Sequence, residues 1–361
     1  MPVPIVDSHI HLFPESHLPT LAWYGPESPL GSQHSIDEYR LATSAVSANA
    51  ETADPVYLRG FIFIETGRIS SAEETGKGWS HALDEVSFLT RIVTGTPVPG
   101  EGHRGVDRHL CLGFVPWAPV PRGSAALQKY MGLVRERTTT DEVWKKVRGV
   151  RYLFQDKPPG TMVQEDVVEG LKWLGRERLV FDLGVDARQG GLWQLREAVE
   201  MMKRVYDGVE ESEQVTIVIN HLGKPNLRLP GASPASVTAH PDFLEWSALV
   251  TAMAQYPRTY MKLSGGFSEL PSLSPGLDFD LRSLVERVCP WTDVVFDTFG
   301  ADRVMFGSDW PVCNVGGGGN EVSWSRWKSV VEQVLQQRKL TDIQKRRVWG
   351  EVAVKAYGVE I

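Results

Sequence analysis

Cysteine is scarce in this chain of 361 residues. There are three, Cys111, Cys289 and Cys313, and no two of them are spaced as in a CxxC motif. A small, odd number of cysteines argues against a disulfide scaffold and favours a reducing compartment, for which we expect the cytoplasm. The N-terminal stretch also lacks a basic region followed by a long apolar run, so no secretory signal is expected.

Long apolar runs and excess positive charge are missing as well. No run approaches the roughly 20 residues that span a bilayer, and the net charge is -7 with a pI ≈ 5.8. These values argue against a membrane or a nucleic acid as the main partner. What remains is an ordinary globular composition, 42% hydrophobic and 23% charged. The length allows a large core, and we expect a single domain over residues 1–361.

Short apolar runs alternate with longer amphipathic stretches along the whole chain. The expected strands cover residues 5–11, 60–65, 110–116, 147–153, 179–184, 215–221, 259–264 and 303–307. The expected helices cover 35–48, 80–94, 124–137, 163–174, 192–206, 242–255, 281–288, 292–299, 323–335 and 341–357. Nearly continuous apolar strands between helices are typical of a parallel sheet that is covered on its outer face. Eight such units predict an α/β fold, the (β/α)8 barrel, with an open doubly wound sheet as the alternative.

The first expected strand ends in two histidines, His9 and His11, separated by one apolar residue. On a strand, residues two apart point to the same side and their Cα atoms lie ~6.6 Å apart. Two imidazoles so placed can converge on one metal ion at ~2.0–2.1 Å each, although two polar residues at a strand end are the simpler interpretation. The last expected strand leads to Asp309, just before Trp310 and a proline. These two ends meet only if the sheet closes on itself.

Polar or aromatic residues end most of the other expected strands, where barrel enzymes carry their active sites. They are Glu65, Trp117, Arg151, Asp182, His221 and Ser264. Glu65 could complete a ligand set with His9, His11 and Asp309, and two imidazoles with two carboxylates would suit Zn²⁺, Mn²⁺ or Ca²⁺. The alternative is that Glu65 pairs with Arg151. After the last strand, Gly316–Gly319 favours a plain loop rather than a phosphate site.

Four motifs together resemble the amidohydrolase superfamily, and most of all its sugar-acid lactonases. They are Asp7-Ser8-His9-Ile10-His11-Leu12-Phe13, Asn220-His221-Leu222-Gly223-Lys224-Pro225, Lys262-Leu263-Ser264-Gly265 and Phe306-Gly307-Ser308-Asp309-Trp310-Pro311. They run from the first strand to the eighth in the family's order, and the second and fourth are the most specific. The chain departs from the family where Arg151 ends strand four without a bridging lysine, and where Asp182 replaces a common histidine ligand in strand five.

The resemblance implies a hydrolase that opens a sugar-acid lactone, such as L-rhamnono-1,4-lactone or a similar aldonolactone. His9 and His11 would be metal ligands, Asp309 a ligand or the base for the attacking water, and His221 a further ligand or a catalytic contact. One divalent ion is expected, zinc first, with manganese, calcium or no metal as alternatives. The substrate-binding candidates are Trp23, Tyr24, Trp117, Arg151, Asp182, Lys224 and Trp310, for which core packing or an internal salt bridge is the alternative.

Two other functions stay open. An aromatic-acid decarboxylase of the same superfamily would use a similar one-metal site, and a binding barrel would keep the fold without the reaction. In each case we expect a small-molecule partner and a monomer or homodimer.

Overall fold

The structure is a computed structural model that describes residues 2–25, 27–48, 56–72, 76–230, 234–271 and 279–361. Eight strands lie in these residues, each within a few residues of its expected range. They are β1 (Val3–Ile10), β2 (Val56–Ile64), β3 (Cys111–Val115), β4 (Gly149–Leu153), β5 (Val180–Gly184), β6 (Ile217–Ile219), β7 (Thr259–Leu263) and β8 (Val304–Phe306).

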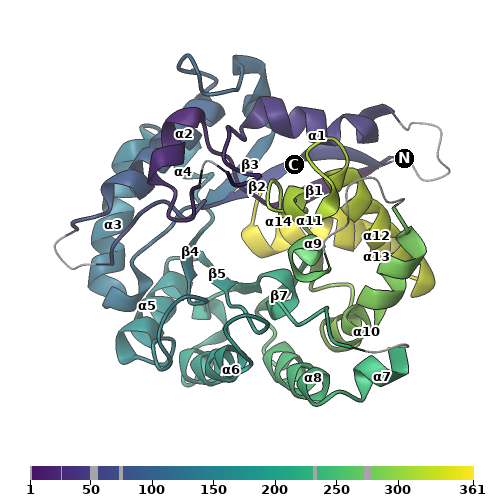
Figure 1. Cartoon of the computed structure of the whole chain (residues 1–361). Coiled ribbons are helices and arrows are strands. Elements are labelled where there is room, and N and C mark those ends of the chain that lie inside the picture. Colours follow the sequence, from purple (N-terminus) through teal and green to yellow (C-terminus); the bar gives the residue numbers. More distant parts are fainter. Residues whose placement is uncertain (1, 26, 49–55, 73–75, 231–233, 272–278) are drawn as a thin grey trace.

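The strands form a ring made of two hydrogen-bonded sheets. One has the order β1-β2-β3 and the other β4-β5-β6-β7-β8, and all neighbouring pairs are parallel. Isolated parallel bridges join the sheets at both seams: Phe114–Val147, Trp117–Arg151 and Ile10–Trp310. Figure 1 shows the helices as an outer layer around these strands. The predicted (β/α)8 architecture is therefore confirmed, and the open sheet is not formed.

Within the described ranges, eight long helices make up the outer layer. They are α1 (Ile36–Ala48), α2 (Ser80–Thr94), α3 (Gly123–Thr138), α5 (Glu165–Arg176), α6 (Trp193–Tyr206), α8 (Pro241–Ala254), α10 (Leu281–Phe299) and α12 (Ser323–Gln337). Shorter helices are α4 (Asp141–Trp144), α7 (Pro234–Thr238), α9 (Gly266–Glu269), α11 (Cys313–Gly317), α13 (Asp342–Arg346) and α14 (Val352–Tyr357), with a π-helical turn at Arg347–Glu351. Among the described residues, none of these helices is both long and apolar enough to cross a bilayer.

Two expectations about the helices are wrong. Residues 281–288 and 292–299 were expected as separate helices, but α10 continues through Pro290. Proline removes one backbone hydrogen bond, and the buried face that includes Val288, Trp291 and Val295 holds the helix together across it. The Gly316–Gly319 run is not a plain loop either, because α11 extends into it as far as Gly317.

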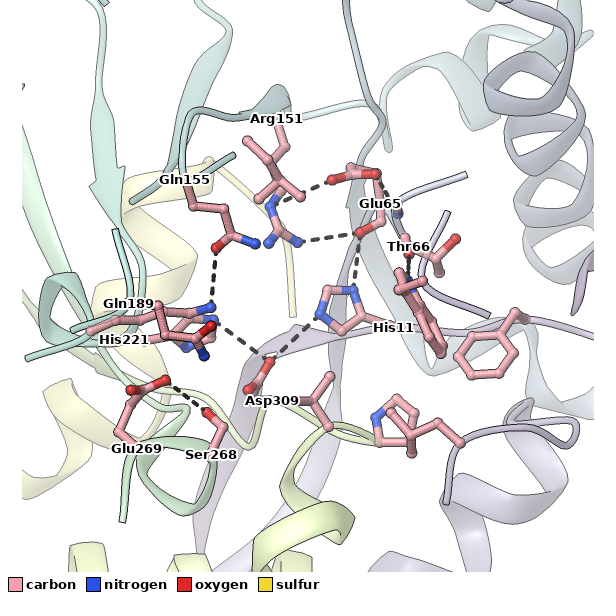
Figure 2. Close-up of a pocket in the computed structure, with 18 of the residues that line it drawn as sticks. His11, Glu65, Thr66, Arg151, Gln155, Gln189, His221, Ser268, Glu269 and Asp309 are labelled. Carbon is pink, nitrogen blue, oxygen red and sulfur yellow. Dashed lines mark hydrogen bonds and ion pairs between the residues drawn. The ribbon is translucent and has the colours of Figure 1, made fainter. Parts of the chain in front are cut away.

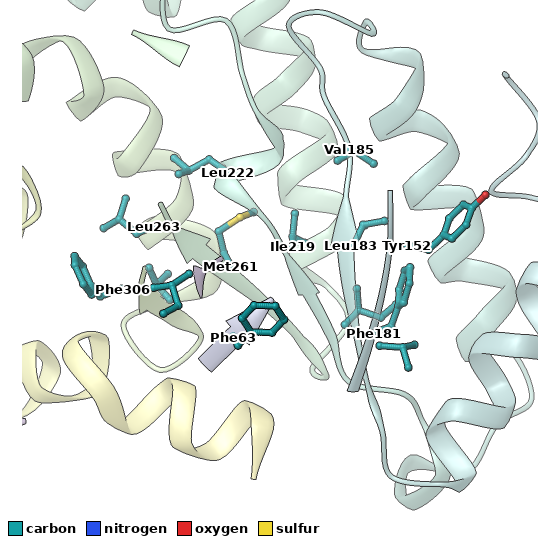
Figure 3. Close-up of a cluster of buried hydrophobic side chains, with 14 of the residues drawn as sticks. Phe63, Tyr152, Phe181, Leu183, Val185, Ile219, Leu222, Met261, Leu263 and Phe306 are labelled. Atoms are coloured by element: carbon teal, nitrogen blue, oxygen red, sulfur yellow. The ribbon is translucent and has the colours of Figure 1, made fainter. Parts of the chain in front are cut away.

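The core has an outer and an inner part. The outer part fills the space between strands and helices, and Figure 3 shows Phe181 and Leu183 of β5 beside Ile219 of β6 and Met261 of β7. The inner part lies within the ring of strands and includes side chains of α14, among them Tyr357. The barrel interior is thus packed below the strand ends, and the open space lies above them.

Candidate active site

Two histidines and one aspartate meet where β1 and β8 end. The Nε2 atoms of His9 and His11 lie 3.2 Å apart, and the Oδ1 atom of Asp309 lies 3.5 Å from the first and 3.6 Å from the second. Ligands bound at ~2.0–2.1 Å in a tetrahedral site are separated by about 3.3 Å. This donor set therefore fits a divalent metal ion, and its three ligand atoms lie within 4.8 Å of one another.

Hydrogen bonds on the far side of each ring orient the two histidines. The Nδ1 atom of His11 lies 2.9 Å and 3.0 Å from the carbonyl oxygens of Ile64 and Glu65. Carbonyls only accept, so this nitrogen carries the proton and Nε2 keeps its lone pair. The Nδ1 atom of His9 instead faces the Nζ atom of Lys262 at 3.0 Å. A charged lysine only donates, which puts the ring proton of His9 on Nε2, and a metal ion would take the place of that proton.

Lys262 contacts the site from below, and sequence reasoning gave it no role. It is fully buried in β7, and its Nζ atom lies 2.8 Å from Oδ2 of Asp182 in β5. The same oxygen accepts a hydrogen bond from the Tyr357 hydroxyl. Burial lowers the pKa of Lys262 to about 8, although Asp182 acts in the opposite direction. Lys262 is therefore charged at neutral pH and links the packed interior to His9.

The position of Asp182 corrects its expected role as a substrate contact. Asp182 is the third residue of the five in β5, one level below the strand end, and its side chain is fully buried against Lys262. It does not line the cavity described below. Its function is to hold the lysine that contacts His9.

Replacing Lys262 with methionine is expected to lower the free energy of unfolding by about 3–5 kcal/mol, because the Asp182 charge would be left buried without its cation. The double variant Lys262→Met/Asp182→Asn should recover much of that loss. Lys345→Met breaks a partly exposed pair with Asp342 and should cost at most about 1 kcal/mol. Urea unfolding of the three variants measures these values. A loss below about 1 kcal/mol for Lys262→Met would show that the pair is not buried as described.

A left-handed turn presents His221 after β6. His221, Leu222, Gly223 and Lys224 all have positive φ angles, 54°, 57°, 73° and 49°. Non-glycine residues rarely adopt this conformation, and where they do the strain is often found at functional sites. The Nε2 atom of His221 lies 3.6 Å from Oδ1 of Asp309, and its Nδ1 atom lies 2.8 Å from Oγ of Ser264. Burial lowers the pKa of His221 to about 3, so this ring is neutral at neutral pH.

Asp309 occupies the centre of the site. It also has a positive φ, 61°, and its N–H donates to the carbonyl of His9 at 2.9 Å, which ties the end of β8 to β1. Burial by itself would raise the pKa of Asp309, but His221 and His11 outweigh it, so the pKa falls below its usual range. The carboxylate is therefore ionised at neutral pH, with imidazole nitrogens of three histidines around one of its oxygens. Figure 2 shows two of them, His11 and His221, on either side of Asp309.

A cavity of about 340 Å³ opens above Asp309, which is a size suited to a small ligand. One wall is apolar and comes from the segments that follow β1 and β8: Phe13, Trp23, Leu30, Pro311 and Val312. The other is polar and comes from the segments that follow β4 to β7: Gln155, Arg188, Gln189, Lys224, Ser268 and Glu269. Figure 2 shows Gln155, Gln189 and Glu269 on the side of Asp309 opposite Glu65 and Thr66.

Each cation of the cavity wall has an acidic partner. Arg188 pairs with Glu269, and the Nζ atom of Lys224 lies 3.7 Å from Oδ2 of Asp186 and 3.1 Å from the amide oxygen of Gln155. Charges that are paired in this way favour a neutral ligand over an anion.

Glu65 is turned toward Arg151 and not toward the three ligand atoms. Its Oε1 atom lies 3.6 Å from Nε of Arg151, and its Oε2 atom accepts a hydrogen bond from the Gly67 N–H at 2.6 Å. The expected fourth ligand is thus absent from the His9, His11 and Asp309 group. The alternative stated for Glu65, a pair with Arg151, is the arrangement that the structure contains.

Of the expected aromatic contacts, Trp23 alone lines the cavity. Trp117 is 8% exposed and packs edge-on against Tyr130 of α3, and Trp310 is fully buried with its Nε1–H donating to Asn320. Tyr24 is 38% exposed but lies outside the cavity lining. These three are corrections: each stands near a strand end or beside Trp23 in the sequence, but its side chain points elsewhere.

The fold and this cluster together define a (β/α)8 barrel with a candidate metal site at the strand ends. The pattern of the amidohydrolase family matches residues 145–359. Over 357 residues the chain is 34% identical to the L-rhamnono-gamma-lactonase of Scheffersomyces stipitis, a match that covers 98% of both proteins. It is 27% identical over 216 residues to the L-fucono-1,5-lactonase of Burkholderia multivorans, or 59% of this chain and 64% of that protein. The chain belongs to the amidohydrolase family.

A solved structure shares the fold over its full length. It is an amidohydrolase from Burkholderia multivorans with bound zinc, 22% identical to this chain, with a TM-score of 0.64 and 99% of each chain covered. At this identity the likeness shows the fold alone.

Proposed function

We propose that this protein hydrolyses the lactone ring of a sugar acid, with L-rhamnono-1,4-lactone or a similar aldonolactone as substrate. The observation that carries the proposal is the ionised carboxylate of Asp309, which lies among three imidazoles at the base of a small cavity. The cations in the wall of this cavity are all paired with acidic side chains. A neutral ring with hydroxyl groups suits such a cavity. The relative with the highest identity reported above is a lactonase for a sugar acid of this kind.

The two walls of the cavity match the two sides of a deoxy-sugar lactone. Gln155, Gln189 and Ser268 offer amide and hydroxyl groups to ring hydroxyls. On the opposite wall, the Trp23 ring is 40% exposed and is held in place because its Nε1–H donates to the Thr66 carbonyl at 2.7 Å. An exposed, fixed indole favours contact with C–H groups or a methyl group.

In this mechanism Asp309 accepts the proton of the attacking water, for which its ionised state is suited. Lys224 and Arg151 line the cavity and supply positive charge for the oxyanion that forms at the carbonyl. His221 is neutral, so it contributes a hydrogen bond and no charge. A divalent ion held by His9, His11 and Asp309 would polarise the carbonyl and lower the pKa of bound water.

We propose zinc as this ion, because two imidazoles and a carboxylate leave one tetrahedral position open for water. Protein purified without chelator should contain about one equivalent of metal per chain by elemental analysis. His11→Gln should abolish that content. His103→Gln, which changes a buried histidine paired with Glu101, should retain it. Full activity in metal-free protein would contradict this and would make His9 and His11 substrate contacts.

The proposed function is tested by acid release from aldonolactones, followed with a pH indicator, beside decarboxylation of dihydroxybenzoates, each with and without chelator. Opening of L-rhamnono-1,4-lactone is the expected result. Turnover of aromatic acids alone would favour the decarboxylase instead, and no turnover of either class would favour a binding barrel. The three free cysteines are compatible with the cytoplasm, where we propose that the enzyme acts as a monomer or homodimer.

A further inference from the structure

Two buried polar atoms face each other in the cavity wall without a hydrogen-bond partner. They are Oε1 of Glu65 and Nε of Arg151, and neither finds a partner in the part of the chain that the structure describes. Both side chains line the cavity, with Glu65 1% and Arg151 7% exposed. Buried polar groups are almost always hydrogen-bonded, so a facing pair without partners calls for an explanation.

The rest of each side chain is held in place. Glu65 accepts from the Gly67 N–H through its other oxygen, and Arg151 donates through a terminal nitrogen to the Glu65 carbonyl at 3.3 Å. The two free atoms lie 3.6 Å apart, too far for a direct hydrogen bond. An oxygen about 2.8 Å from each of them would contact both.

The chemistry of the pair selects the group that can sit there. A carboxylate only accepts and would be repelled by Glu65, whereas an ammonium only donates and would be repelled by Arg151. A hydroxyl group donates and accepts, so it satisfies both atoms at once. We infer that Glu65 and Arg151 form a subsite for one substrate hydroxyl and make the enzyme selective for lactones that carry it.

The position of the subsite indicates which hydroxyl it binds. The Glu65 carbonyl lies 3.0 Å from Nδ1 of His11, whose Nε2 atom lies 3.6 Å from Asp309. The subsite thus shares one cavity with Asp309 and is connected to it through His11. When the lactone carbonyl lies over Asp309, the hydroxyl on the neighbouring carbon, C2, is the group within reach. This assignment rests on the proposed lactonase function and adds a specificity pair to it.

The test compares kcat/KM for L-rhamnono-1,4-lactone and its 2-deoxy counterpart. Wild-type protein should prefer the hydroxylated lactone by about 10–100-fold, the usual effect of hydrogen bonds to charged groups. In Glu65→Gln the new amide oxygen can still accept the hydrogen bond from the Gly67 N–H. The amide NH₂ group then faces Arg151, so the substrate hydroxyl meets two donors and no acceptor. The preference should then fall below about threefold. Arg151→Lys, which removes Nε, should have the same effect.

Glu269→Gln is the matched control, because it makes the same change on the opposite wall, where Glu269 pairs with Arg188. The Glu269→Gln variant is assayed on both lactones, and its preference for the hydroxylated lactone should stay at the wild-type value. Equal rates for both lactones in the wild type would overturn the subsite and leave the lactonase function standing. A preference that survives both Glu65→Gln and Arg151→Lys would also overturn it. If the wild type opens neither lactone, the proposed function itself fails.

Discussion

Asp309→Asn is expected to lower kcat for a sugar-acid lactone by at least 10²–10⁴-fold, the usual contribution of a general base. Asparagine keeps the shape of the side chain but cannot accept a proton. The loss in kcat should exceed that caused by a substitution far from the site, because Oδ1 of Asp309 is also the atom on which His9, His11 and His221 converge. The backbone bond from Asp309 to His9 is unaffected by the substitution, so the variant should fold.

Asp107→Asn is a suitable control for that experiment. Asp107 is a fully buried aspartate that pairs with Arg40 and Arg104, away from the cavity. Its replacement should change thermal stability and leave kcat near the wild-type value. Circular dichroism and melting curves establish that both variants are folded before their rates are compared. If Asp309→Asn kept a near wild-type rate, the base would have to be another carboxylate of the cavity, Glu65 or Glu269.

The barrel could be predicted from the sequence because its signals are local. Each strand is a short apolar run and each long helix an amphipathic stretch, and their alternation indicates the topology without any tertiary information. The seam between β1 and β8 follows from the same pattern, since His9 lies near the end of the first strand and Asp309 follows the last. The ends of the helices could not be predicted in this way, because they depend on packing. Pro290 predicts a helix end, but α10 continues past it because one side of the helix is buried.

The site could be predicted only in part because side-chain direction is not a local property. Trp117 and Trp310 follow strand ends as a mouth residue would, yet both point into the core. Lys262 could have been recognised from the sequence, because a charged residue in an otherwise apolar strand requires a buried partner. Its partner, Asp182, is 80 residues away in the sequence, and only the parallel ring of strands brings the two together.

Loop residues of the cavity left no such signal. Phe13, Leu30, Arg188 and Gln189 contribute to the walls through loops, and Glu269 through the short helix α9; the course of these segments depends on tertiary contacts. Arg188, for example, is held by the Lys224 carbonyl, which accepts from its N–H at 2.9 Å. In the sequence such residues cannot be distinguished from other polar or apolar surface residues.

The polar wall predicts a strong dependence of the reaction on substrate hydroxyls. A site built to hydrogen-bond hydroxyl groups rejects analogues that lack them by ~10⁴–10⁵ in kcat/KM, because its buried polar groups are then left without partners. Here these include Oε1 of Glu65 and Nε of Arg151, together with the amides of Gln155 and Gln189 in the cavity lining. L-rhamnono-1,4-lactone should therefore exceed γ-butyrolactone by that factor in an indicator assay of acid release. The two compounds share the ester and the five-membered ring, so differences in intrinsic reactivity are corrected with their rates of hydroxide-catalysed opening. Comparable values for both after this correction would contradict the sugar-lactone assignment, and would indicate that the paired charges of the wall serve the fold and not the substrate.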